Sequence, residues 1–375
     1  SSTSRGLGDV YKRQTCHDVY NYGASLQAYA LMSYLKQLGH DVEIIDYKPD
    51  YLNNHYKLKV VNPVYDKPII KQLYLLAKLI PHLRSLKRKK LFDTFKHNYL
   101  KITSICYANN EELKKNLPDA DLYIAGSDQI WNTLFNNGRD PAFYLDFAPK
   151  DKLKVSYAAS MATSKIAPGF ENFVYSMVKR LDYIGVRERS AAEILNKLDI
   201  TNVHVVCDPV FLLTMQQWKS FINVNKPIYT KPYILVYDFD HSKSIYDISC
   251  FLAHSENLKV IAIGLTKFGK LADQSIKTGP IEFLNLIYHA RYVISNSFHA
   301  TAFALLFHKE FYVVRREESL NERMVNLLED LDLRTRLVSS VSELTKKNID
   351  YTHVQELLNN TIQRSKDYIT LFTTR

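Results

Sequence analysis

The sequence predicts an α/β protein built from two doubly wound, Rossmann-like domains that face each other across a central cleft. Short apolar strands alternate with helical segments along most of the 375 residues, which is typical of parallel sheets covered by helices on both faces. The alternation falls into two series. Polar loops follow several of the strands, at the positions where ligands bind in folds of this kind.

The first fourteen residues do not fit this pattern. The chain starts without Met, and residues 9–14 resemble a translated transposon end of the kind used in sequencing-library adapters. We therefore interpret residues 1–14 as a non-native scar and leave them out of the fold prediction. A genuine polar tail is the alternative. If the segment is a scar, the native first strand is missing and residues 15–17 are its end.

The first domain is predicted over residues 15–180. Apolar residues at helical spacing indicate a helix over 26–38 that ends at Gly39, followed by a buried strand over 42–46. Residues 51–100 break the rhythm and form a basic helical insertion. This insertion is either a solvated helical face or, over residues 71–96, a surface that contacts the inner membrane.

The later elements continue the alternation. A second domain is predicted over 181–345 and a C-terminal helix over 346–375. Strands are expected at 122–125, 154–159, 183–186, 233–237, 259–263, 292–295 and 311–314.

Composition narrows the protein class. The hydrophobic fraction of 46% and charged fraction of 23% are ordinary for soluble globular proteins. Neither an apolar run of membrane-spanning length nor a secretory leader is present, which predicts a cytoplasmic location. The four cysteines are scattered, so we expect reduced thiols, and they lack the spacing of a metal site. No metal or cofactor is expected.

The net charge of +10 favours an anionic partner, which is a phosphorylated metabolite, a lipid surface or a nucleic acid. Nucleic acid is the weakest of the three, because the basic residues do not form a known binding module. Glycine-rich phosphate loops of the Walker and dinucleotide types are also absent.

The most informative loop follows the strand at 292–295. Three small polar residues there lead into an apolar helix that His299 opens. A helix start offers free N–H groups and a positive dipole end, which suits phosphate or carboxylate. Histidine there can exchange protons with a substrate near neutral pH. A capping run with a packed histidine explains the pattern equally well.

A second polar loop, at 126–132, follows another predicted strand. Its Ser127, Asp128 and Asn132 can hold sugar hydroxyls and its Trp131 can stack on a sugar ring. A turn whose Asp bonds its own backbone is the alternative. Arg187 and Arg323 are candidate forks for carboxylate or phosphate, although a lone Arg more often forms a surface ion pair.

With these segments in order, the sequence resembles the polysaccharide pyruvyl transferase family. The resemblance spans residues 15–340. It rests on the segments Asn21-Tyr22-Gly23-Ala24-Ser25-Leu26-Gln27-Ala28, Gly126-Ser127-Asp128-Gln129-Ile130-Trp131-Asn132, Ser156-Tyr157-Ala158-Ala159-Ser160, Val186-Arg187-Glu188-Arg189-Ser190, Asp208-Pro209, Ser297-Phe298-His299-Ala300-Thr301 and Asn321-Glu322-Arg323.

The resemblance implies a fold like that of the GT-B glycosyltransferases, and a reaction between phosphoenolpyruvate and a sugar or lipid-linked glycan. The product is a pyruvate ketal on a surface polysaccharide or its precursor, made without metal. The implied roles are a catalytic proton carrier at His299, donor binding by Arg187, Asn296, Ser297 and Arg323, and acceptor binding by Asn21, Tyr22, Gly23, Ser127, Asp128, Trp131 and Asn132.

One residue departs from the family pattern. Many members carry Arg two positions before the histidine, where this chain has Ser297. Other groups must therefore bind the anionic part of the donor. Two other functions stay open. One is a glycosyltransferase of similar architecture that uses a nucleotide-sugar, and the other is a non-catalytic glycan-binding protein of the same fold.

Overall fold

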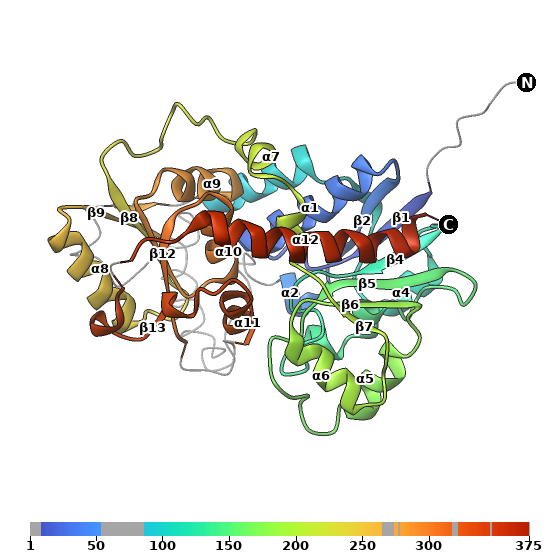
Figure 1. Cartoon of the computed structure of the whole chain (residues 1–375). Coiled ribbons are helices and arrows are strands. Elements are labelled where there is room, and N and C mark those ends of the chain that lie inside the picture. The colour runs from blue at the N-terminus through green and yellow to red at the C-terminus, as the bar shows by residue number, and fades with distance from the viewer. Residues whose placement is uncertain are drawn as a thin grey trace, which may run out of the picture.

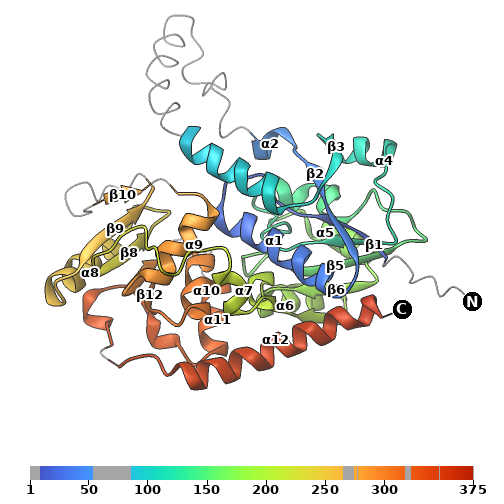
Figure 2. The same cartoon turned by 90° about the horizontal axis from the view of Figure 1, so that it is seen from above.

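The computed structural model describes residues 9–53, 86–264, 274–276, 278–316, 322–345 and 347–374. Two parallel sheets lie side by side, each flanked by helices (Figures 1 and 2). The observed architecture is therefore the predicted pair of doubly wound domains.

The described strands of the N-terminal sheet are all parallel and lie in the order β3-β2-β1-β4-β5-β6-β7. They are β1 Val10–Gln14, β2 Asp41–Tyr47, β3 Ile102–Tyr107, β4 Leu122–Ala125, β5 Leu153–Ala159, β6 Tyr183–Val186 and β7 Val203–Val205. Strands β4, β5 and β6 lie on the predicted apolar runs, because a strand covered on both faces buries nearly every side chain. The helices of this half are α1 Tyr22–Gln37, α2 Asp50–Asn53, an unlabelled helix over 86–99, α4 Asn110–Lys115, α5 Glu171–Val178 and α6 Arg189–Lys197.

The described strands of the C-terminal sheet lie in the order β10-β9-β8-β11-β12-β13, again all parallel. They are β8 Tyr233–Tyr237, β9 Lys259–Ile263, β10 Gln274–Ile276, β11 Tyr292–Ser295, β12 Glu310–Val314 and β13 Leu337–Val338. The helices of this half are α7 Met215–Lys219, α8 Lys243–Ser255, α9 Pro280–His289, α10 Phe298–Leu306, α11 Glu322–Asp330 and α12 Tyr351–Thr373.

The boundary between the domains differs from the prediction. Because β6 and β7 pair within the N-terminal sheet, the chain leaves that sheet after Val205 and not at residue 180. The final helix, α12, runs back along both domains (Figure 1). Its Tyr368 hydroxyl donates to the Ser156 carbonyl at 2.8 Å. The C-terminal helix therefore binds directly to strand β5 of the N-terminal sheet.

The prediction that the first strand is missing is wrong. β1 occupies the centre of its sheet, paired with β2 on one side and β4 on the other. The fully buried Arg13 guanidinium donates to the carbonyls of Gly126 at 2.7 Å and Ala28 at 2.6 Å. Backbone pairing on both sides holds this polar segment in place. The non-native origin of residues 1–14 stays a prediction.

Most of the predicted membrane-contacting surface, 71–96, lies outside the described residues. In its described part, Arg88 donates to the Tyr20 carbonyl at 2.6 Å and lies 4.8 Å from the centre of the Phe92 ring. Lys89 pairs with Asp93 at 2.5 Å. These basic groups therefore serve internal packing. In the described part of the chain, no helix is both long and apolar enough to cross a membrane.

Gln14 carries a stability prediction. Its side chain is fully buried at the end of β1, and neither its amide oxygen nor its amide nitrogen has a partner among the described residues. Such a group costs about 1–3 kcal/mol. We expect Gln14→Met to raise the melting temperature, because Met fills the space without buried polar atoms.

The matched control is Gln37→Met at the exposed end of α1, which should leave the melting temperature unchanged. Equal melting temperatures of the Gln14→Met variant and the wild type would contradict the burial of the Gln14 amide without a hydrogen-bond partner.

Candidate active site

A cleft of about 300 Å³ lies between the two sheets, where the carboxyl ends of their strands meet. Loops from both domains line it, as expected for ligand sites in parallel sheets. The N-terminal half contributes Cys16, Val19, Asn21, Leu52, Asp128, Gln129 and Asn137, and the C-terminal half contributes Phe239, Asn296, Ser297, Phe298, His299, Arg316 and Arg323.

His299 lies in the first turn of α10. The Ser297 hydroxyl caps this helix by accepting from the Ala300 N–H at 3.4 Å. The His299 Nε2 lies 3.3 Å from Asp208 Oδ2, and the face of its ring packs against Gly23 next to Nδ1. A Cβ atom at Gly23 would come within 1.9 Å of that nitrogen. Gly23 therefore makes room for the imidazole ring.

Asp208 connects the histidine to an arginine. Its carboxylate is fully buried and accepts from Arg187 Nη1 at 2.7 Å with the same oxygen that faces His299. Burial alone would raise the pKa of Asp208, but His299 and Arg187 outweigh it and hold the pKa well below its usual value. Asp208 is thus a fixed negative charge buried between His299 and Arg187.

Two guanidiniums converge beside this pair. Arg187 and Arg323 lie 4.8 and 5.6 Å from the centre of the same Phe298 ring. Burial and the charge of Arg187 lower the pKa of Arg323 to about 10. Arg187 Nε and Nη2 and Arg323 Nε have no hydrogen-bond partner among the described residues. An anionic ligand would relieve both conditions, because it compensates the charge and accepts from guanidinium nitrogens.

The loop after β4 approaches the same guanidiniums. Asp128 Oδ1 lies 3.8 Å from Arg187 Nη2 and 4.0 Å from Arg323 Nη1. With its amide oxygen facing Arg323, Gln129 accepts from Nη1 at 3.1 Å and from Nη2 at 2.6 Å. This loop therefore fixes the position of Arg323 without fully neutralising it.

Five residues predicted to bind the acceptor do not line the cleft, and one of them, Gly23, packs against His299. Tyr22 stacks on Phe283, with ring centres 4.5 Å apart, and bonds Thr278 at 2.7 Å, so it joins the two domains. Trp131 is fully buried, where it stacks on Tyr144 and donates to the Phe143 carbonyl at 3.0 Å.

The other two are polar residues of the same loop. Ser127 and Asn132 are also fully buried. The Ser127 hydroxyl donates to the Ala158 carbonyl at 2.9 Å, and the Asn132 amide oxygen accepts from the Leu134 N–H at 3.1 Å. The loop after β4 folds back into its own core, so of its predicted residues only Asp128 lines the cleft.

Asn296 lines the cleft, and its amide group holds a neighbouring loop. Its amide accepts from the Phe239 N–H at 3.0 Å and donates to Asp238 at 2.9 Å. Arg316 donates to both carboxylate oxygens of Asp240 at 2.6 Å. These bonds fix the loop after β8, while the Phe239 side chain stays 44% exposed in the cleft.

Sequence reasoning missed several groups at this site. Asp208 was part of a recognised segment but had no predicted role, and Gln129, Arg316 and Phe239 were not singled out. Asp208-Pro209 directly after a short strand was an available signal, because a carboxylate there lies at the cleft edge. The contacts of the other three join segments far apart in the sequence, which no local pattern shows.

Comparisons with known proteins agree with this architecture. A family model described as polysaccharide pyruvyl transferase matches residues 21–318. The UDP-GlcNAc 2-epimerase of Methanocaldococcus jannaschii is similar in structure, with 13% identity and a TM-score of 0.53 over 98% of this chain and 99% of that chain. The corresponding epimerase of Rickettsia bellii shows 11% identity and a TM-score of 0.53, covering 98% of each chain.

At these identities the structural likeness concerns the fold alone. It confirms two Rossmann-like domains in the GT-B arrangement. No curated protein sequence matches the chain.

The contact between Gly23 and His299 gives a sharp prediction. In most helices Gly→Ala stabilises by about 1 kcal/mol. At Gly23 the added Cβ collides with the imidazole, so we expect Gly23→Ala to lower the melting temperature. In a His299→Ala background the same change should be neutral or stabilising, because the ring is gone. Equal effects in both backgrounds would rule out the contact.

Asp208→Asn tests the shared carboxylate. The change leaves buried cations without their main counter-ion, which costs about 3–5 kcal/mol. The folded-state pKa of Asp208 lies below its unfolded value of about 3.9. Its stabilisation is therefore present above about pH 4 and is lost as the pH falls below that value. Chemical denaturation should show that the difference in free energy of unfolding between wild type and variant becomes smaller as the pH falls.

Glu329→Gln is the control for that change, because it removes an exposed carboxylate that lies 3.3 Å from Arg334. It should cost at most about 1 kcal/mol. If the difference in free energy of unfolding between wild type and Asp208→Asn stays constant down to pH 2.5, the lowered pKa of Asp208 is contradicted.

Proposed function

Because the chain belongs to the polysaccharide pyruvyl transferase family, we propose that it moves a pyruvyl group from phosphoenolpyruvate to two hydroxyls of one sugar. The product is a pyruvate ketal on a surface polysaccharide or its precursor. The observation that carries this proposal is the placement of His299, backed by Asp208, beside the two guanidiniums of Arg187 and Arg323. The reaction requires this combination of one proton carrier and paired cations.

The donor carries a carboxylate and a phosphate, which are two anionic groups. Arg323 is the better candidate for direct contact, because it lines the cleft and Asp128, the carboxylate paired with it among the described residues, is 4.0 Å away. Arg187 is already paired with Asp208 at 2.7 Å, but two of its nitrogens have no partner among the described residues. Together they replace the Arg that many family members carry at the position of Ser297.

The chemistry follows from the orientation of His299. With Nε2 facing Asp208, Nδ1 is the nitrogen that delivers a proton to the methylene carbon of the donor. That carbon becomes the methyl group, and the central carbon becomes electrophilic. One sugar hydroxyl forms a bond to the central carbon and gives up its proton. The carbon–oxygen bond to phosphate breaks, and the second hydroxyl closes the ketal and releases its own proton.

The proton balance is closed. Two hydroxyl protons are lost, one is recovered on the methyl group by way of the histidine, and one leaves with phosphate. Asp208 stabilises the imidazolium at the start of the cycle, because its fixed negative charge lies next to Nε2.

The acceptor side of the cleft carries an aromatic surface. Phe239 is held by the bond from its N–H to Asn296, and its exposed ring faces the cleft. A fixed, exposed ring in a polar cleft suits the apolar face of a sugar. Phe239 therefore takes the stacking role that the sequence had suggested for Trp131, while Asn21 and Asp128 offer polar atoms nearby.

Donor identity is tested by ligand-dependent melting. Phosphoenolpyruvate at 100 times its Kd should add about 2.7 kcal/mol of stability to the wild type. Arg323→Ala should weaken donor binding about 10- to 100-fold, since it removes charge-assisted hydrogen bonds. His299→Gln should keep the shift and lose phosphate release.

Arg334→Ala is the control, because Arg334 is a half-exposed Arg outside the cleft. Stabilisation by nucleotide-sugars alone would contradict the proposal and favour glycosyl transfer. Glycan binding with no turnover of any donor would favour a non-catalytic protein.

The acceptor surface is tested by Phe239→Ala. Loss of aromatic stacking is worth about 0.5–1.5 kcal/mol, so the acceptor KM should rise a few-fold, up to roughly tenfold, while donor binding stays unchanged. Phe251→Ala is the matched control, because Phe251 is 49% exposed on α8 and does not line the cleft. An acceptor KM that is the same in both variants would remove Phe239 from the site.

A further inference from the structure

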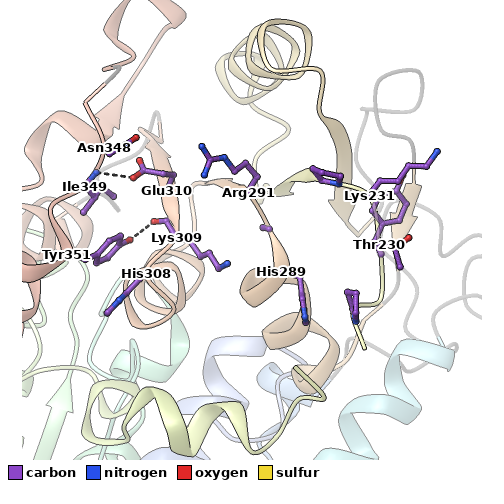
Figure 3. Close-up of a pocket in the computed structure, with 14 residues that line it drawn as sticks. Thr230, Lys231, His289, Arg291, His308, Lys309, Glu310, Asn348, Ile349 and Tyr351 are labelled. Carbon is purple, nitrogen blue, oxygen red and sulfur yellow. Dashed lines mark hydrogen bonds between the residues drawn. The ribbon is translucent and has the colours of Figure 1, made fainter. Parts of the chain in front are cut away.

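A second cavity, of about 620 Å³, opens at the amino ends of the C-terminal strands. It lies at the opposite edge of that sheet from the cleft, where β8, β11 and β12 begin (Figure 3). We call it the amino-edge cavity and define it by Lys231, His289, Arg291, His308, Lys309 and Glu310, together with the segment 348–351.

Positive charge collects in the amino-edge cavity. Lys231, Arg291 and Lys309 precede the three strands and line it. Lys219 lies close by, since its Nζ and that of Lys309 lie 5.1 and 5.3 Å from the centre of the same Tyr288 ring. None of these four cations forms an ion pair with a carboxylate of the described residues. The cavity thus concentrates charge that the described protein groups do not compensate.

The one carboxylate that lines the cavity is already occupied. Glu310 lies 2.7 Å from Arg336 Nη1 and accepts from the Ile349 N–H at 2.9 Å, a bond drawn in Figure 3. It therefore cannot neutralise the lysines.

The two histidines are also engaged. Both ring nitrogens of His289 lie 2.9 Å from backbone carbonyls, those of Asn285 and Val224. His308 Nε2 lies 3.3 Å from Gln355. The groups left to meet a ligand are the lysines and Arg291.

The lysines repel each other. Burial, Lys219 and Arg291 together lower the pKa of Lys309. A single carboxylate would compensate only one of these positive charges. A phosphate ester carries nearly two negative charges at pH 7 and presents three acceptor oxygens, which match guanidinium and ammonium donors.

We propose that the amino-edge cavity binds a phosphate group, as a phosphorylated or diphosphorylated ligand held by Lys309 and Arg291, with Lys231 exposed at its rim. Its volume falls within the range of small-molecule sites. The site is separate from the cleft and does not depend on the pyruvyl transfer proposed above.

The test titrates inorganic pyrophosphate into the full chain by calorimetry at fixed ionic strength. It uses the Arg323→Gln variant beside the wild type, because the cleft also holds cations. We expect binding to persist in Arg323→Gln. The further changes Lys309→Gln and Arg291→Gln together should weaken it at least about tenfold, through the loss of charge-assisted hydrogen bonds.

The control pair, Lys150→Gln with Arg334→Gln, removes the same two charges from positions outside the cavity and should leave pyrophosphate affinity unchanged. Equal weakening by both pairs, or no binding to the wild type, would overturn the proposal. Lys309→Gln relieves repulsion, so the unliganded variant should melt no lower than the wild type. If the double variant unfolds, Lys231→Gln at an exposed position carries the test instead.

A second arm identifies the source of the phosphate. Sedimentation with phosphatidylglycerol vesicles, but not phosphatidylcholine vesicles, that requires Lys309 and Arg291 assigns a lipid headgroup. Pyrophosphate binding without such sedimentation assigns a soluble phosphorylated compound. Both results support the binding of a phosphate group in the amino-edge cavity. Vesicle binding that does not change in the Lys309 and Arg291 variants would rule out a lipid headgroup as the ligand of these two residues.

Discussion

The carboxylate of Asp208 is the interaction on which the rest of the site depends. It lies in the segment that connects the two sheets, and one of its oxygens faces both Arg187 of the N-terminal domain and His299 of the C-terminal domain. The buried guanidinium of Arg187 is stable there only because this negative charge is buried with it. The same contact thus closes the interface and orients the histidine.

Several features of the site follow from that contact. With Nε2 of His299 facing Asp208, the face of the ring packs against Gly23, where a side chain would not fit. Asp208 compensates the charge of Arg187. The charge of the second guanidinium, Arg323, is not fully compensated, and its lowered pKa reflects this, so an anionic ligand would stabilise it. The Phe298 ring keeps both guanidiniums near the histidine. His299 can carry a proton, and the positive charge of Arg323 is not fully compensated by the protein. Such a site favours an anionic substrate that receives a proton during the reaction.

The sequence predicted the sheets better than the site. Strands β4, β6, β8, β9 and β11 lie where apolar runs placed them, because a strand buried on both faces leaves a continuous apolar run. β1 was missed because residues 1–14 were interpreted as a non-native scar, and its pairing with β2 and β4 shows that it fills the centre of the sheet.

At the site, His299 was predicted from its position after a strand, Arg323 as a candidate fork for an anion, and both from the family resemblance. Trp131 was misassigned, since an aromatic residue after a strand can turn inward as readily as outward, and here it stacks on Tyr144. The partnership of Asp208 with Arg187 and His299 joins three distant segments. Their meeting depends on how the two sheets face each other, which local sequence patterns do not specify.

The most direct test of the account follows the hydrogen that His299 is proposed to deliver. Full-length protein, phosphoenolpyruvate and a glycan acceptor are combined in D₂O, and the product is analysed by NMR and mass spectrometry. The account predicts release of phosphate and a ketal whose methyl group carries one deuterium, with neither formed by a folded His299→Gln variant. Transfer of a sugar from a nucleotide-sugar, or a deuterated ketal formed equally well without His299, would contradict it.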